Sequence, residues 1–231
     1  MSAEERKQEA GFAAVDRFVR DGMCIGLGTG STALWAIRRV GEMVANGASL
    51  SAVPTSRSTA DLCRELNIPI VGLLECEIAV AIDGADEVAA DDSLTKGGGG
   101  ALFREKSVAL AAAQFIVIVD ESKLVERLGA FATPVEVVPF GVGWVEREIG
   151  RLHPGIRIVR RGEATPFVTD NGNAILDCHF GSIANPASLS RTLLELHGVV
   201  DTGLFIDLTD EVVVAGAGGV RFLRDLGVAR P

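Results

Sequence analysis

Cysteine and histidine are scarce in this sequence of 231 residues. The cysteines, Cys24, Cys63, Cys76 and Cys178, form no CxxC pair, so a cytoplasmic protein with reduced thiols is the simplest expectation. The three histidines are far apart and lack the spacing of metal ligands, so the sequence indicates no metal site.

Positive charge and long apolar runs are also in short supply. Lysine and arginine total 22 against 31 acidic residues, a formal net charge of −9. Binding to nucleic acid relies on basic side chains meeting phosphates, so we expect no nucleic-acid partner, although a few donors can still bind a small anion. No window is long enough to span a membrane, and the charged N-terminal residues lack the apolar core of a signal peptide, so we expect no membrane partner.

Apolar strands alternate with amphipathic helices over the first 123 residues. Hydrophobic residues make up 48% of the chain, which is typical of a globular protein. The pattern predicts helices over 3–20, 31–45, 58–67 and 101–113, and strands over 23–28, 50–56, 68–73, 78–86 and 114–123. Ser58 or Thr59 is the expected cap of the third helix. Continuous apolar strands favour an open, mostly parallel, Rossmann-like sheet with helices on both faces.

The pattern changes near residue 132. Residues 134–150 read as strand, loop and helix, residues 156–180 as a hairpin turning at Asp170–Asn173, and residues 185–198 as a helix. These elements predict a small α+β, ferredoxin-like domain over 132–204, which we consider a candidate for oligomerisation. Residues 203–219 return to a buried strand pattern, so the catalytic α/β domain is expected to comprise 1–131 and 205–231.

The stretch GLGTGSTA, residues 26–33, lies between a predicted strand and a helix. Its glycines allow a tight turn whose N–H groups face an anion, and Thr29, Gly30, Ser31 and Thr32 add donors at the helix start. Ser31 occupies the place of the third glycine in a dinucleotide fingerprint, and no GK[ST] follows. We favour a phosphate cradle for a small ligand; a tight turn with a helix cap is the simpler alternative.

Two aspartates, Asp83 and Asp86, lie at the end of the predicted strand at 78–86. Close carboxylates can differ in protonation and share proton transfer. A solvated turn is the simpler explanation, and a cation site with Asp91 and Asp92 is disfavoured because the spacing is not that of a calcium loop.

The stretch TKGGGGALFREK, residues 95–106, has four consecutive glycines. Glycine allows close approach to a ligand, Lys96 can stabilise an oxyanion, and Glu105 on the next helix can act as a general base. The simpler alternative is a flexible loop with a surface ion pair. Lys123 in DESK and Lys7 on the first helix are weaker candidates, since each can be a solvated lysine.

Taken in order, GTGSTA, DGADE, KGGGGAL–REK and DESK resemble ribose-5-phosphate isomerase, type A. The stretches PVEVVPFG and TDNGNAILDCHFGSIANPASLSRTLLELHGVVDTGLF extend this resemblance over nearly the whole chain. One local departure is Gly100, where relatives often have alanine.

The resemblance implies conversion of D-ribose 5-phosphate to D-ribulose 5-phosphate through a cis-enediolate, without metal or cofactor, in the pentose phosphate pathway. Glu105 matches the base, Lys96 the stabiliser of the enediolate oxygen, and Asp83 and Asp86 the groups that handle hydroxyl protons and ring opening. The remaining matches are substrate contacts: Thr29, Gly30, Ser31, Thr32, Gly97, Gly98, Lys123 and Lys7. A homodimer or homotetramer is expected from the family.

Three other functions compete with this interpretation. A related sugar-phosphate isomerase or amino-sugar-phosphate deaminase can share the plan, but no histidine lies near Asp83 or Asp86 in sequence. A sugar-phosphate sensor of a transcription regulator needs a basic helix-turn-helix, for which there is no spare segment. A nicotinamide-dependent oxidoreductase is disfavoured by the broken glycine fingerprint.

Overall fold

The computed structural model describes residues 2–162 and 165–224, and the chain forms two compact units. Unit 1 comprises Met1–Ala85, Arg104–Lys123 and Leu208–Pro231, and unit 2 comprises Asp86–Phe103 and Leu124–Asp207. The small domain expected over 132–204 lies within unit 2, which also includes residues 86–103, 124–131 and 205–207. Within the described residues, no helix combines the length and apolar character needed to cross a membrane.

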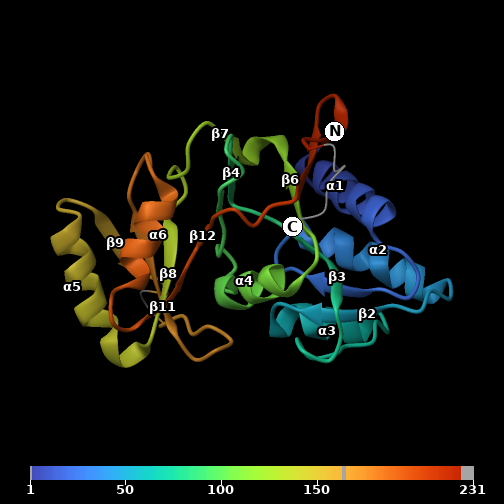
Figure 1. Ribbon diagram of the computed structural model, residues 1–231, viewed down its shortest axis with the longest axis horizontal. Coiled ribbons are helices and arrows are strands. Elements are labelled where there is room, and N and C mark those ends of the chain that lie inside the picture. Colours follow the sequence, from blue (N-terminus) through green and yellow to red (C-terminus); the bar gives the residue numbers. More distant parts are fainter. Residues whose placement is uncertain (1, 163–164, 225–231) are drawn as a thin grey trace. The chain divides into compact units, whose positions relative to one another are not determined.

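A six-stranded sheet forms the centre of unit 1 (Figure 1). Its strands are β1 (Cys24–Leu27), β2 (Ser51–Pro54), β3 (Ile78–Asp83), β6 (Phe115–Asp120), β13 (Glu211–Gly216) and β14 (Gly219–Phe222). The spatial order is β14-β13-β6-β3-β1-β2, and every neighbouring pair is parallel except β13 with β14. The predicted parallel sheet is confirmed, as is the return of the C-terminal segment to it.

Helices cover both faces of this sheet, as the continuous apolar strands predicted. The helices are α1 (Ala3–Phe18), α2 (Ala33–Ala45), α3 (Arg57–Glu65) and α4 (Leu102–Ala111). Ala14 of α1 and Val40 of α2 share one buried cluster with Ile25 of β1. Successive strand residues point to opposite faces, and on the other face a Cβ added to Gly26 would lie 2.4 Å from Val108 of α4.

Strand order identifies the point of this sheet at which a ligand is expected to bind. The chain passes from β1 to its neighbour β2 on one side and then to β3 on the other side, so the winding direction reverses between β1 and β3. Ligands of doubly wound sheets bind beyond the carboxyl ends of the strands at such a reversal. The loops after Leu27 and Asp83 occupy that position.

Unit 2 contains the predicted ferredoxin-like fold. Its elements follow the order β8 (Thr133–Val137), α5 (Val142–Leu152), β9 (Arg157–Arg160), β10 (Ala174–His179), α6 (Pro186–Leu194) and β11 (Val199–Thr202). They form an antiparallel sheet in the order β11-β8-β10-β9, the split β-α-β arrangement. Its core joins Val135 and Leu176 of the sheet to Ile149 of α5 and Leu193 of α6.

A second small sheet of unit 2 was not predicted. It has the order β12 (Leu204–Phe205), β5 (Leu94–Thr95), β4 (Glu87–Ala89) and β7 (Leu124–Val125). Glu87 is buried and accepts hydrogen bonds from the Thr95 hydroxyl and from the backbone N–H groups of Gly129 and Phe131. These strands have two or three residues each, too few to show a periodic sequence pattern.

Two local predictions were wrong. The segment 68–73 is not a sheet strand: only Ile70 forms an isolated bridge, to Ala52, and Pro69 lacks the N–H that a ladder needs. Helix α3 is capped by Ser56, whose hydroxyl accepts the Thr59 N–H at 3.0 Å, so neither Ser58 nor Thr59 is the cap.

The predicted hairpin is present, but its turn is different. Strands β9 and β10 pair antiparallel, yet β9 ends at Arg160 and residues 161–173 connect it to β10. The predicted turn at Asp170–Asn173 closes only the end of this connection, where Thr169 and Asn173 are joined by a backbone hydrogen bond of 2.9 Å.

The expectation that the thiols are reduced was wrong for one pair. Cys24 and Cys76 form a disulfide, with their Cα atoms 6.4 Å apart. The two residues are 52 positions apart, so spacing along the chain gave no sign of the pairing. Cys63 and Cys178 are free and buried, and burial raises the pKa of Cys63 to about 11 and that of Cys178 to about 12.

Candidate active site

The loop after β1, residues 26–33, is called here the first glycine loop. It lies against Asp83 at the end of β3, because a Cβ on Gly28 would lie 1.9 Å from Asp83 Oδ1. That same oxygen accepts the N–H groups of Thr29 at 3.1 Å and Gly84 at 2.7 Å. Asp83 is only 3% exposed, so the two backbone donors fix a buried carboxylate at the point where the winding direction of the chain reverses.

Hydroxyl groups hold the first glycine loop to the end of β2. Thr29 Oγ1 lies 2.8 Å from both Thr55 Oγ1 and Ser56 Oγ, and 3.1 Å from Thr59 Oγ1. Thr59 in turn donates its hydroxyl proton to the Gly28 carbonyl at 2.8 Å. The Thr29 side chain is therefore committed to supporting the loop, a role that its sequence position did not reveal.

The rest of the first glycine loop is more open. Gly30 and Ser31 are exposed, and the φ of Gly30, +125°, lies in the region that favours glycine. Thr32 occupies the cap position of α2, but its hydroxyl makes no capping bond there. The predicted anion cradle needs an accessible loop at a helix start, and the exposure of Gly30 and Ser31 before α2 is compatible with that prediction.

Glu105 lies in the first turn of α4 and is 4% exposed. It precedes Val108 by three residues, so both lie on the same side of the helix. Val108 contacts the sheet at Gly26, as described above, and this contact buries that side of α4. A carboxylate that acts as a base needs surroundings that exclude water, and the burial of Glu105 is compatible with its prediction as a base.

Lys123 follows β6 in the short 3-10 helix η1 (Glu121–Lys123). Its charge acts on Asp120 at the end of that strand. Burial opposes ionisation of Asp120, but hydrogen bonds from Ser122 and the charges of Lys123 and Arg6 outweigh burial, so its pKa lies below the ordinary 3.8. On α1, Nζ of Lys7 lies 3.4 Å from Oε2 of Glu4, and the Lys7 side chain is 21% exposed.

Residues 96–100, called here the second glycine loop, follow β5 in unit 2. Lys96 is 2% exposed, its N–H donates to the Gly203 carbonyl at 2.8 Å, and its Nζ lies 5.4 Å from the Phe205 ring centroid. A buried ammonium on an aromatic face acts in a medium where electrostatic interactions are strong.

Asp86 is joined to the second glycine loop by a hydrogen bond. The Gly98 N–H donates to Asp86 Oδ2 at 2.8 Å, and a Cβ on Gly98 would lie 2.7 Å from Asp86 Oδ1. Gly97 has a φ of +101°, which favours glycine at this position. Glycine is therefore favoured at position 97 by the backbone conformation and at position 98 by the close approach of the Asp86 carboxylate.

The predicted site residues are divided between the two units. Unit 1 holds Lys7, Thr29, Gly30, Ser31, Thr32, Asp83, Glu105 and Lys123, and unit 2 holds Asp86, Lys96, Gly97 and Gly98. Within unit 1 the structure brings Thr29 to Asp83, and within unit 2 it brings Asp86 to Gly98. Across residues 2–162 and 165–224, no three His, Cys, Asp or Glu side chains are grouped to hold a metal ion.

Sequence reasoning missed several supporting residues. Thr55 and Ser56 are polar residues at the end of the predicted strand 50–56, and that position was the available signal. Thr59, one turn into α3, gave none.

Comparisons with known proteins agree on one family. The family model for ribose 5-phosphate isomerase A (phosphoriboisomerase A) matches residues 51–219. Ribose-5-phosphate isomerase A of Bacillus mycoides is 46% identical over 217 residues, covering 93% of this chain and 97% of the relative. Among solved structures, ribose 5-phosphate isomerase A of Methanocaldococcus jannaschii is 40% identical, with a TM-score of 0.90, and covers 96% of this chain and 100% of its own.

A second similar structure was solved with a bound ligand. It is a D-ribose-5-phosphate isomerase in complex with phospho-erythronic acid, 38% identical, with a TM-score of 0.92. The match covers 97% of this chain and 100% of that one.

Proposed function

Because the chain belongs to the ribose 5-phosphate isomerase A family, we propose that it interconverts D-ribose 5-phosphate and D-ribulose 5-phosphate in the pentose phosphate pathway. The observation that carries the proposal is the 46% sequence identity to ribose-5-phosphate isomerase A of Bacillus mycoides, over 97% of the length of that protein. The complex of another relative with phospho-erythronic acid, a four-carbon phosphorylated acid, supports a phosphorylated sugar as the substrate.

Glu105 is the proposed base. It removes the C2 proton from the open-chain aldose and returns it to C1 of the enediolate, so the proton balance is closed. Its burial supports this role, because a base shielded from bulk water can retain the proton between the two steps.

Lys96 is the proposed stabiliser of the enediolate oxygen. The ammonium opposes negative charge that is greater in the transition state than in the bound sugar, so it should accelerate the reaction rather than only bind substrate. Its 2% exposure supports a strong electrostatic effect.

Asp83 and Asp86 are the proposed carriers of hydroxyl protons. Conversion of the aldose moves one hydroxyl proton from O2 to O1, and ring opening also requires a proton transfer. The backbone donors of Thr29 and Gly84 hold Oδ1 of Asp83 in a fixed position.

Substrate contacts are proposed for two groups of residues. The first is the start of α2 with its loop, Thr29, Gly30, Ser31 and Thr32, and the second is Gly97, Gly98, Lys123 and Lys7. For Thr29 the proposal concerns the backbone carbonyl, since the hydroxyl is bonded to the end of β2 and the N–H to Asp83.

The proposal extends to the setting of the enzyme. We propose a cytoplasmic, metal-free and cofactor-free isomerase that assembles as a homodimer or homotetramer, with the ferredoxin-like domain as a contributor to assembly. The last point is tested by measuring the molar mass in solution of the parent protein and of variants substituted at exposed positions within 132–204, such as Phe140.

Turnover of D-ribose 5-phosphate by chelator-treated protein, followed by NMR, tests the function. Formation of D-ribulose 5-phosphate at an undiminished rate is expected. Saturable binding without turnover would instead favour a sugar-phosphate sensor, and activity that returned only with a divalent ion would overturn the metal-free proposal.

A further inference from the structure

The second glycine loop is held by a side chain from a distant part of unit 2. Arg161, at the start of the connection between β9 and β10, donates from Nη1 to the Gly97 carbonyl at 2.8 Å and to the Gly98 carbonyl at 3.2 Å. These two carbonyls directly follow Lys96 in the chain. Arg161 therefore contacts the backbone that carries the proposed enediolate stabiliser.

The other nitrogens of the same guanidinium are fixed by a carboxylate. Nε of Arg161 lies 2.9 Å from Asp177 Oδ2, and Nη2 lies 2.5 Å from Oδ1. The side chains of Arg161 and Asp177 are only 17% and 19% exposed. A bidentate pair of this kind fixes the direction of the planar guanidinium, so Nη1 is aimed at the loop before substrate arrives.

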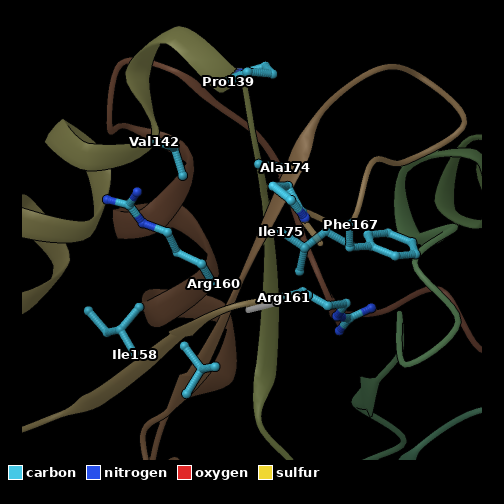
Figure 2. Close-up of a pocket in the computed structure, with 11 residues that line it drawn as sticks. Pro139, Val142, Ile158, Arg160, Arg161, Phe167, Ala174 and Ile175 are labelled. Carbon is cyan, nitrogen blue, oxygen red and sulfur yellow. The ribbon is translucent and has the colours of Figure 1, made fainter. Parts of the chain in front are cut away.

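Phe167 provides a second contact from the same connection. A Cβ on Gly100 would lie 2.3 Å from Phe167 Cζ, so the aromatic ring packs on the glycine backbone. The guanidinium of Arg161 lies 5.6 Å from the Phe167 ring centroid. Figure 2 shows these two side chains side by side, with Arg160 pointing away from them.

The connection that carries Phe167 is itself anchored in the core. Glu136 of β8 is fully buried and accepts hydrogen bonds from Thr169, Asn171 and Asn173 through Oε1. This explains the TDNGN stretch as a support for the connection. Rigid contacts thus run from the core of the ferredoxin-like fold to the loop that follows Lys96.

We propose that Arg161, oriented by Asp177, is a positioning residue that holds the second glycine loop so that Lys96 meets the developing oxyanion. The proposal rests on the proposed isomerase function. Four consecutive glycines give the loop little stiffness of its own, so its conformation must be imposed by neighbours. Catalysis is sensitive to such placement, because a displacement of about 1 Å can cost about 100-fold in rate.

Arg161→Gln is the test variant and Arg160→Gln is its matched control. Arg160 is the preceding residue and also pairs with a carboxylate, Glu146 of α5, at 2.6 Å, but is not bonded to the loop. We expect kcat of Arg161→Gln to fall about 10- to 100-fold with little change in KM, and Arg160→Gln to stay within about twofold of the parent. Arg161→Lys should be intermediate, because one ammonium cannot replace both sets of contacts.

Combining each variant with Lys96→Ala separates positioning from general destabilisation. If Arg161 acts through Lys96, Arg161→Gln should change the residual activity of Lys96→Ala by less than about threefold. An undiminished kcat in Arg161→Gln, or an equal fall in both backgrounds, would overturn the proposal. All rates are measured well below the unfolding temperature of each variant, and Asp177→Asn replaces Arg161→Gln if the latter does not fold.

Glycine-selective ¹⁵N labelling gives a readout that does not need activity. Arg161→Gln should shift or broaden the amide signals of Gly97, Gly98 and Gly100, whereas Arg160→Gln should leave them in place. Unmoved signals in Arg161→Gln would reject the clamp. If the parent protein itself fails to convert ribose 5-phosphate, the proposed function fails, and these spectra still decide whether Arg161 holds the loop.

Discussion

The two glycine loops are held in different ways. The first glycine loop is supported from the two strands that flank β1: Asp83 is the last residue of β3, and Thr55 and Ser56, whose hydroxyls contact Thr29, directly follow β2. The second is supported by Arg161, 64 residues away from Gly97 along the chain. A parallel sheet brings the supports of its own loops to one edge, whereas the second glycine loop, outside that sheet, depends on a side chain from the ferredoxin-like fold of the same unit.

The largest expected effect comes from the lysine of the second glycine loop. Lys96→Ala should lower kcat by about 10²- to 10³-fold, because it removes a charge that acts in the transition state. Ser31→Ala, on the first glycine loop, should mainly raise KM, because it removes a substrate donor. Steady-state kinetics of both variants measure the contrast. A fall in affinity alone for Lys96→Ala would make Lys96 a binding residue and erase this difference between the loops.

A methyl group at Gly28 tests the close packing of the first glycine loop. Gly28→Ala places a Cβ 1.9 Å from Asp83 Oδ1, so loop or carboxylate must move, at a cost of about 1–3 kcal/mol in the free energy of unfolding. Gly150→Ala is the control, since its Cβ meets nothing within 4 Å in helix α5 and should stabilise by about 0.5–1 kcal/mol. Denaturant unfolding compares them, and equal stability of the two variants would contradict the close contact.

Removing one hydroxyl tests the cluster beneath the first glycine loop. Thr59→Val leaves the buried Gly28 carbonyl without its donor and should destabilise the protein by about 1–2 kcal/mol. Thr133→Val is the matched control, because the Thr133 hydroxyl is buried without a hydrogen-bond partner among the described residues. Unfolding curves should show a loss for Thr59→Val and no loss, or a gain, for Thr133→Val. The reverse order would show that the cluster contributes little.

The smallest effect concerns Asp120 at the end of β6. The pKa of Asp120 is lower in the folded protein than its ordinary value of 3.8. Ionised Asp120 therefore stabilises the folded state at pH values above 3.8, and this stabilisation is lost as the pH falls through the pKa of the folded state. Asp120→Asn should therefore be less stable than the parent at neutral pH, with a difference that shrinks below pH 3.8. Unfolding measured against pH checks the direction, and a difference that grew on acidification would be inconsistent with the lowered pKa.

The sheet and the first glycine loop could be predicted because their signals are local. Residues 26–33 show a strand, a glycine turn and a helix start within one short stretch, and Asp83 ends an apolar run. Ferredoxin-like elements were also visible, since their helices are long enough to show periodicity.

The support that Arg161 gives to the second glycine loop could not be predicted, because Arg161 is distant from the loop in sequence. Arg161 sits in a polar stretch, and nothing nearby indicates that its guanidinium reaches Gly97 and Gly98. The Cys24–Cys76 disulfide was missed for the same reason. The strand predicted over 68–73 was wrong for a different reason. Its apolar residues are typical of a strand, but Pro69 has no N–H to donate and only Ile70 forms a bridge.

Proton exchange at Glu105 tests the central claim most directly. Parent protein and Glu105→Gln are incubated with ribose 5-phosphate in deuterated water, and ketose formation and deuterium at C1 are followed by NMR. The parent should form ribulose 5-phosphate with deuterium at C1 in the fraction of turnovers in which the proton on Glu105 exchanges with solvent before its return, while Glu105→Gln should bind the sugar phosphate but form no ketose. Labelled ketose formed by Glu105→Gln at the parent rate would contradict the assignment of Glu105 as the base.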